Sequence, residues 1–174
     1  MHIFLTGEIQ VGKSTLIRKT LAVLPPLRLT GFRTVTVSDV PGALGSVYIL
    51  GAEEAPLRYR PDRRVMLRYG VGRRAERFPE VFETAGLSLL EGAETGELIL
   101  MDEIGKAEGA APRFCARVRE LLDGPTPILG VVRQEGETPL QQFIRRHPAV
   151  EIIRVTRENR DELAGVLAGR LRRT

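Results

Sequence analysis

The sequence predicts a three-layer α/β domain with a mostly parallel central sheet flanked by helices. Segments with apolar residues at helical spacing alternate along the chain with short apolar runs, and several of these runs are apolar at every position. Continuous apolarity is typical of strands covered on both faces, as in a parallel sheet. The length of 174 residues suits one compact domain, which we expect to span residues 1–174.

The N-terminal part predicts a strand, a loop, a helix and a hairpin. The largely apolar run His2–Thr6 predicts the strand. Apolar residues at helical spacing between Lys13 and Leu24 predict the helix, which Pro25 ends. β-branched residues then flank a connection rich in glycine, and this pattern predicts a β-hairpin near residues 31–50.

The rest of the chain continues the alternation of helices and strands. The predicted elements are a helix over 78–90, a strand over 97–103, a helix over 112–122, a strand over 127–132, a helix over 140–146, a strand over 150–155 and a terminal helix capped by Asn159. We expect the terminal helix to bury Leu163, Val166, Leu167 and Leu171 on one face. Such an alternation implies right-handed crossovers between parallel strands.

Positive charge is concentrated in one segment. Between Arg58 and Arg77 there are eight arginines against Asp62 and Glu76, so this segment carries +6 and the remainder −2 of the net charge of +4. Prolines and glycines in the same segment predict loop and short irregular pieces. Because the remainder is near neutral, nucleic-acid binding is an alternative that the charge pattern does not favour.

Composition excludes several classes of protein. No apolar run reaches the roughly 18–20 residues needed to cross a bilayer, and the first residues have no leader pattern, so we expect no membrane contact and no secretion. One cysteine excludes an intramolecular disulfide, and two histidines with one thiol do not suit a structural zinc site. We therefore expect a cytoplasmic protein, and a monomer.

The loop after the first strand has the pattern G-x4-G-K-S, typical of a phosphate-binding loop. Backbone N–H groups of such a loop surround a phosphate, and the following helix adds the positive end of its dipole. Lys13 would contact the terminal phosphates, and the Ser14 hydroxyl is a hard oxygen ligand for Mg²⁺. The candidate nucleotide-binding residues in this loop are Gly7, Glu8, Ile9, Gln10, Val11, Gly12, Lys13, Ser14 and Thr15.

Two acids end the apolar run of the 97–103 strand. Asp102 at the carboxyl end of a buried strand can hold Mg²⁺ together with Ser14, and Glu103 can act as general base on the attacking water. Two solvent-facing acids at a strand end are the alternative. Adjacent carboxylates repel each other, so a buried pair makes physical sense beside a cation.

A resemblance to a known family follows from four stretches. TGEIQVGKSTL, LTGFRTVTV, GVGRR followed by FPEVFE, and LMDEIGKAEG resemble the small nucleoside-triphosphatases of the THEP1 type, called cancer-related NTPases in animals. The resemblance implies a P-loop NTPase fold of the ASCE type, related to RecA and AAA+ ATPases. It also implies hydrolysis of ATP, GTP and other nucleoside triphosphates to the diphosphate and phosphate, with Mg²⁺ as cofactor.

The same resemblance assigns roles to residues. Lys13 and Ser14 would bind phosphate and metal, Asp102 would bind magnesium, and Glu103 would activate water. Gln10 stands where the family usually has glycine. Arg73 and the residue after it replace the family's Lys-Tyr, and Arg73 at this position would close over the nucleotide.

Arg133 is a further candidate catalytic residue. It follows a strand that we expect to lie between the strands of the phosphate loop and of the two acids, so its side chain can point at the γ-phosphate as a sensor or arginine finger. The alternative is an ordinary surface arginine just past a strand.

Three functions compete at this point. The first is a Mg²⁺-dependent nucleoside-triphosphate phosphohydrolase. The second is a small nucleotide or nucleoside kinase, and the third is a nucleic-acid-binding protein switched by ATP. Glu103 favours the first, because a kinase must exclude water rather than activate it.

Overall fold

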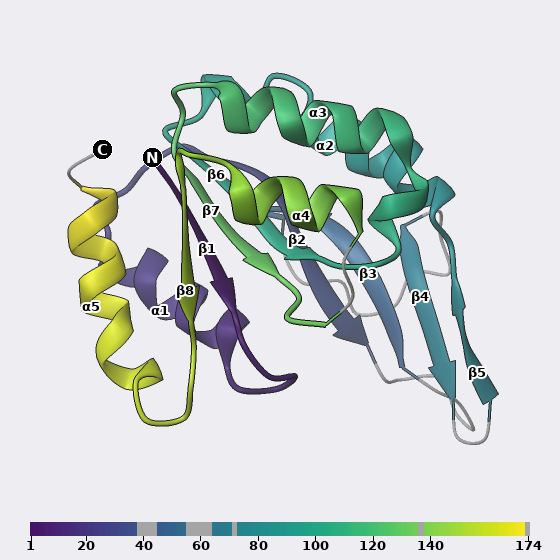
Figure 1. Cartoon of the computed structure of the whole chain (residues 1–174), viewed down its shortest axis with the longest axis horizontal. Coiled ribbons are helices and arrows are strands. Elements are labelled where there is room, and N and C mark those ends of the chain that lie inside the picture. Colours follow the sequence, from purple (N-terminus) through teal and green to yellow (C-terminus); the bar gives the residue numbers. More distant parts are fainter. Residues whose placement is uncertain (38–44, 55–63, 71–72, 136–137, 173–174) are drawn as a thin grey trace.

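A computed structural model describes residues 1–37, 45–54, 64–70, 73–135 and 138–172 (Figure 1). The strands are β1 (His2–Thr6), β2 (Leu29–Val37), β3 (Ser46–Gly51), β4 (Val65–Gly70), β5 (Arg73–Arg77), β6 (Leu98–Ile104), β7 (Ile128–Val132) and β8 (Val150–Arg154). The α-helices are α1 (Lys13–Val23), α2 (Leu87–Leu90), α3 (Pro112–Asp123), α4 (Pro139–Arg146) and α5 (Arg160–Leu171). A π-helical turn, Phe82–Gly86, precedes α2, and 3₁₀ turns occupy Ala93–Thr95 and Glu108–Ala110.

The described strands form one eight-stranded sheet in the order β5-β4-β3-β2-β6-β7-β1-β8. β2, β6, β7, β1 and β8 are parallel, whereas β3, β4 and β5 continue the sheet as an antiparallel meander. Helices α1 and α5 cover one face, and α2, α3 and α4 cover the other (Figure 1). The predicted three-layer α/β class is thereby confirmed, and β2 with β3 confirms the predicted hairpin.

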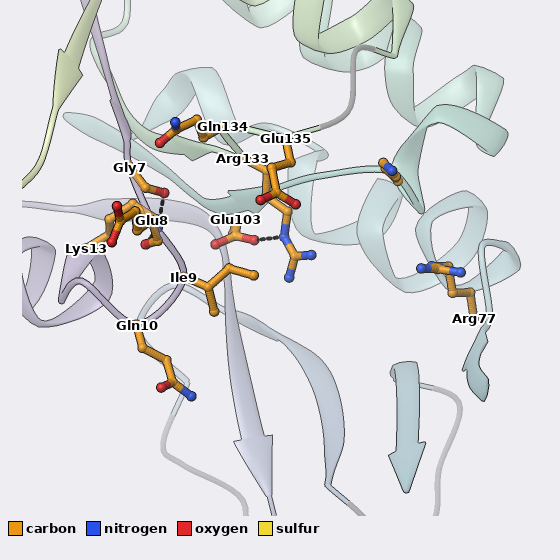
Figure 2. Close-up of a pocket in the computed structure, with 11 residues that line it drawn as sticks. Gly7, Glu8, Ile9, Gln10, Lys13, Arg77, Glu103, Arg133, Gln134 and Glu135 are labelled. Carbon is orange, nitrogen blue, oxygen red and sulfur yellow. Dashed lines mark hydrogen bonds and ion pairs between the residues drawn. The ribbon is translucent and has the colours of Figure 1, made fainter. Parts of the chain in front are cut away.

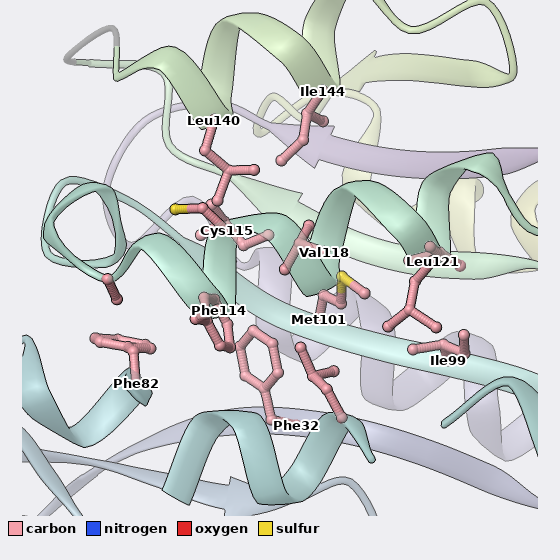
Figure 3. Close-up of a cluster of buried hydrophobic side chains, with 14 of the residues drawn as sticks. Phe32, Phe82, Ile99, Met101, Phe114, Cys115, Val118, Leu121, Leu140 and Ile144 are labelled. Atoms are coloured by element: carbon pink, nitrogen blue, oxygen red, sulfur yellow. The ribbon is translucent and has the colours of Figure 1, made fainter. Parts of the chain in front are cut away.

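Successive residues of the central strands alternate between two cores. Ile99 and Met101 of β6 face the core under α3, where Phe32 and Phe114 meet with ring centroids 5.6 Å apart (Figure 3). Leu98 and Leu100 of the same strand face the second core under α1 and α5. Because both faces are covered, the first four positions of β6 are all apolar, which is the pattern seen in the sequence.

The prediction for the arginine-rich segment is partly wrong. Where loop was expected, residues 65–70 and 73–77 form the paired strands β4 and β5, while 55–63 lie outside the described residues. Val65 and Met66 are buried and supply the apolar contact that holds β4 on the sheet. Arg68 is exposed and stacks on the Phe78 ring, so charge on the outer strands is compatible with pairing.

Two expectations for α5 and its start are corrected. Val166 was expected on the buried face, but its side chain is 45% exposed, because the helix packs through Leu167 and Ala168. Asn159 stands at the N-cap position without a capping bond to the helix; its side chain instead bonds the backbone of Thr156 and Arg154. No helix among the described residues is both long and apolar enough to cross a bilayer.

Candidate active site

The loop between β1 and α1 forms the centre of the site. Gly7 has a φ angle of 144°, and a Cβ there would lie 2.5 Å from the carbonyl oxygen of Val155. Gly12 has a φ angle of 109° where α1 begins. Glycine adopts these backbone angles more easily than other residues do. At position 7 a larger residue would also clash with the Val155 carbonyl oxygen. Gln10, with a φ angle of 62°, adopts a left-handed conformation without that freedom.

The last part of the chain supports this loop. The backbone N–H of Val155 donates to the carbonyl oxygen of Thr6 at 2.8 Å, so the β1–β8 pairing holds the chain directly before the loop. From α5, Arg160 donates to the carbonyl oxygen of Val11 at 3.2 Å. The two contacts fix both ends of the loop against α5 and the segment before it.

Lys13 is the first residue of α1, and its almost fully buried side chain reaches back into the loop. The Lys13 Nζ donates to the carbonyl oxygens of Gly7 at 3.0 Å and Glu8 at 2.7 Å. Burial lowers the pKa of Lys13, the nearby Glu103 carboxylate opposes that shift, and Arg133 adds to it. The charges of Glu103 and Arg133 therefore act on Lys13 in opposite directions.

The two predicted metal ligands lie together although they are far apart in sequence. The Ser14 hydroxyl donates to Asp102 Oδ1 at 3.4 Å, and Asp102 is only 4% exposed near the end of β6. Burial raises the pKa of Asp102 to about 6, and the hydrogen bond from Ser14 partly offsets this. A carboxylate in such surroundings is stabilised when a cation binds beside it.

Glu103 and Arg133 form an ion pair at the strand ends. Arg133 Nε donates to Glu103 Oε1, and the Arg133 backbone N–H donates to the Ile104 carbonyl oxygen at 3.0 Å. β7 lies between β1 and β6, as the sequence predicted. This strand order places the end of β7 beside both the loop and the two acids.

These groups meet at one cavity of about 390 Å³ (Figure 2). Figure 2 shows Glu103 between the phosphate loop and Arg133. The residues that line the cavity are Gly7, Glu8, Ile9, Gln10, Lys13, Arg77, Glu103, Lys106, Arg133, Gln134 and Glu135. Three predicted catalytic residues, Lys13, Glu103 and Arg133, are therefore brought to a single hollow.

The other predicted residues lie around this cavity. Ser14 and Asp102 line an adjacent hollow, and Gly12 and Thr15 line another beside Arg160. Val11 does not line the main cavity, because its side chain is buried in the core under α1. Arg73 begins β5, but its side chain lies outside the part of the chain that the structure describes.

Four residues of the cavity, Arg77, Lys106, Gln134 and Glu135, are not among the predicted site residues. Gln134 and Glu135 directly follow Arg133, so their place after the same strand was an available signal. Arg77 enters from β5, which the sequence analysis had taken as loop, and in Figure 2 its guanidinium group points toward the cavity. The antiparallel meander thus contributes a cation to a site otherwise built by the parallel strands.

The fold and the loop together define a three-layer P-loop NTPase fold. An NTPase family model matches residues 2–167. The chain is 34% identical to the human protein named cancer-related nucleoside-triphosphatase, over 93% of this chain and 92% of the relative. It is 28% identical to nucleoside-triphosphatase THEP1 of Methanosarcina acetivorans, over 99% and 98%.

A solved structure is similar over nearly the whole chain. The crystal structure of THEP1 from the hyperthermophile Aquifex aeolicus matches with a TM-score of 0.75 and 26% identity, covering 98% of this chain and 99% of that one. The protein belongs to the NTPase family that includes the THEP1-type and cancer-related nucleoside-triphosphatases. The resemblance recognised in the sequence is confirmed.

Proposed function

We propose that the protein is a Mg²⁺-dependent phosphohydrolase that converts ATP, GTP and other nucleoside triphosphates to the diphosphate and phosphate. The observation that carries the proposal is the meeting of Lys13, Glu103 and Arg133 at one cavity beside the phosphate loop. The names of the related proteins, which call them nucleoside-triphosphatases, support the same reaction.

The loop and Lys13 would bind the polyphosphate. In the protein without nucleotide, the Lys13 ammonium group donates to two carbonyl oxygens of the loop. Phosphate oxygens would take the place of these acceptors when a nucleotide binds. Burial of the Lys13 side chain limits competition from water and strengthens a charge-assisted hydrogen bond to phosphate. The positive end of α1, which begins at Lys13, favours the same anion.

The residues present fit a magnesium ion. Ser14 and Asp102 offer hard oxygen ligands 3.4 Å apart, and the burial of Asp102 makes its charge costly unless a cation is near. No group of three or more His, Cys, Asp and Glu among the described residues forms a metal cage, and Mg²⁺ ordinarily completes its shell with water and phosphate oxygens. When bound, the ion would neutralise charge on the β- and γ-phosphates.

Glu103 would accept the proton of the attacking water. It lies at the end of β6 next to Asp102, and its ion pair with Arg133 fixes the carboxylate at the cavity. A carboxylate within reach of both a water and a terminal phosphate can act as general base. Arg133 brings a positive charge to the same region. It would stabilise the negative charge on the oxygens of the transferred γ-phosphoryl group in the transition state.

Release of inorganic phosphate from Mg·ATP and Mg·GTP tests this function. We expect turnover in the absence of any acceptor. Lys13→Ala should reduce turnover to background, and Glu103→Gln should retain Mg·NTP binding while kcat falls roughly 10²–10⁴-fold. Lys19→Ala is the matched control, because Lys19 lies on the same helix and pairs with Asp161 on the surface.

The same assay separates hydrolysis from the kinase alternative. A panel of nucleosides and nucleoside monophosphates is added as acceptors, and their phosphorylation is measured. Phosphate transfer to an acceptor, with negligible release in its absence, would contradict the proposal. Intact triphosphate after incubation with the folded protein and Mg²⁺ would contradict it as well.

A further inference from the structure

Glu108 is a buried carboxylate that the proposed reaction does not use. It is 2% exposed and lies in the 3₁₀ turn that follows β6. Its side chain accepts a hydrogen bond from the backbone N–H of Gly105 at 2.9 Å. No ion pair with Glu108 is formed by the described residues, so its charge is not neutralised by a direct partner.

The bond to Gly105 fixes the turn that leads out of β6. This turn joins Glu103 and Lys106, which both line the cavity. A Cβ on Gly105 would lie 3.1 Å from Cδ of Arg133 and 3.4 Å from its Nε, so the Arg133 side chain lies directly against Gly105. Glu108 therefore holds the surface on which Arg133 lies.

Arg133 is held from the opposite side by α4. The Arg133 carbonyl oxygen accepts from Gln141 Nε2 at 3.4 Å, and Gln141 is fully buried in the capping box of that helix. The 3₁₀ turn and α4 also meet, because a Cβ on Gly109 would lie 3.0 Å from Cγ2 of Thr138. Buried polar groups thus fix the Arg133 backbone on one side and its side chain on the other.

We propose that Glu108 is a positioning residue for hydrolysis: it holds Gly105 so that Arg133 lies against it and orients the Glu103 carboxylate. The inference rests on the proposed function and deepens it. A misplacement of about 1 Å in a catalytic group can lower turnover by roughly 10²-fold, so a residue that never touches substrate can still control the rate.

Charged and polar groups from three parts of the fold face Glu108. Glu103 and Arg133 act on Glu108 through space, and from α3 the Cys115 thiol donates to its carbonyl oxygen at 3.1 Å. Burial raises the pKa of Glu108 to about 7, and the nearby Glu103 adds to this rise.

Glu108→Gln tests the proposal in the full chain. Glutamine carries no charge and offers one neutral acceptor oxygen in place of a carboxylate, so its hydrogen bond from the Gly105 N–H is weaker. We expect kcat to fall about 10- to 100-fold with KM within about twofold of wild type. In the nucleotide-free protein, we expect the NMR signal of the Arg133 Nε–H to lose the shift caused by its bond to Glu103.

Glu83→Gln is the matched control. Glu83 is also a carboxylate that accepts backbone N–H groups, those of Arg113 at 2.8 Å and Phe114 at 3.2 Å, but it caps α3 and does not line the cavity. We expect this variant to keep the wild-type kcat and the wild-type Arg133 signal. A merely structural role of Glu108 would lower the melting temperature of Glu108→Gln and leave its Arg133 signal unchanged.

Gly105→Ala provides the second test if Glu108→Gln does not fold. The added Cβ pushes on Arg133 while Glu108 stays intact, so we expect the same loss of kcat and of the Arg133 signal. Wild-type values of kcat and of the Arg133 signal in both variants would overturn the inference while leaving the hydrolase function standing. If the wild type releases no phosphate, the proposed function fails, and the Arg133 signal alone then decides whether Glu108 positions the ion pair.

Discussion

At the scale of single residues, Gln10 shows a local conflict in the phosphate loop. Its φ angle of 62° lies in the left-handed region, which costs an L-residue with a side chain about 1–2 kcal/mol. Glycine loses more backbone entropy on folding, by about 0.5–1 kcal/mol, but avoids the steric cost. The neighbouring Ile9 is 70% exposed although it is apolar. The loop therefore keeps two side chains at the cavity mouth that its folding does not require.

Gln10→Gly is expected to stabilise the protein by roughly 0.5–1 kcal/mol, the difference between the steric and entropic contributions. Urea unfolding followed by circular dichroism measures this change. Ala116→Gly, at an exposed position inside α3, is the control of opposite sign and should destabilise by about 1 kcal/mol. A destabilised Gln10→Gly would show that the Gln10 side chain makes contacts that outweigh its backbone cost.

At the scale of elements, close approach between β7 and β1 depends on one glycine. A Cβ on Gly130 would lie 2.4 Å from the ring of Phe4, which belongs to the neighbouring strand. Since β7 lies between the loop strand and the strand of the acids, its spacing sets where Arg133 meets Glu103. The packing of two core residues thus determines the position of two site residues.

Gly130→Ala should destabilise the fold by about 1–3 kcal/mol, because the added methyl group overpacks a filled core. Thermal or urea unfolding provides the measurement. Gly165→Ala is the matched control, since its Cβ meets nothing within 4 Å inside α5, and it should stabilise by up to about 1 kcal/mol. A Gly130→Ala variant as stable as wild type would mean that the Phe4 ring moves without cost.

The elements also show how far sequence reasoning reaches. β6 and the phosphate loop were predictable, because continuous apolarity and glycine spacing are direct consequences of burial and backbone geometry. β4 and β5 were not, because their pairing depends on the neighbouring strand β3, while prolines, glycines and arginines dominate the local pattern. The contact between Gly105 and Arg133 was not predictable either. The two residues follow different strands, and only the order of strands in the sheet brings them together.

At the scale of the whole molecule, buried titratable groups make stability depend on pH. Burial raises the pKa of Glu108 to about 7 and that of Asp102 to about 6, from ordinary values of 4.5 and 3.8. Between the ordinary and the raised pKa of each group, the unfolded chain binds fewer protons than the folded protein does. Both groups therefore make the fold less stable as the pH rises. Burial lowers the pKa of His2 to about 4, which has the opposite effect as the pH falls below 6.5.

We therefore expect the free energy of unfolding, measured in urea without Mg²⁺, to decrease between pH 5 and pH 7. The Glu108 contribution alone amounts to at most about 3 kcal/mol, since each pKa unit corresponds to about 1.4 kcal/mol. Glu108→Gln should flatten this dependence, and Glu83→Gln should leave it unchanged. Equal slopes for wild type and Glu108→Gln would show that Glu108 stays ionised in the folded protein.

The support that Val155 and Arg160 give to the phosphate loop has a consequence during synthesis. β1 and its loop leave the ribosome before their supports, because the partners of Thr6 and Val11 lie about 150 positions later in the chain. A nascent polypeptide that lacks Val155 and Arg160 cannot assemble a rigid anion cradle. Capacity to capture nucleotide should therefore arise only after both residues have been synthesised.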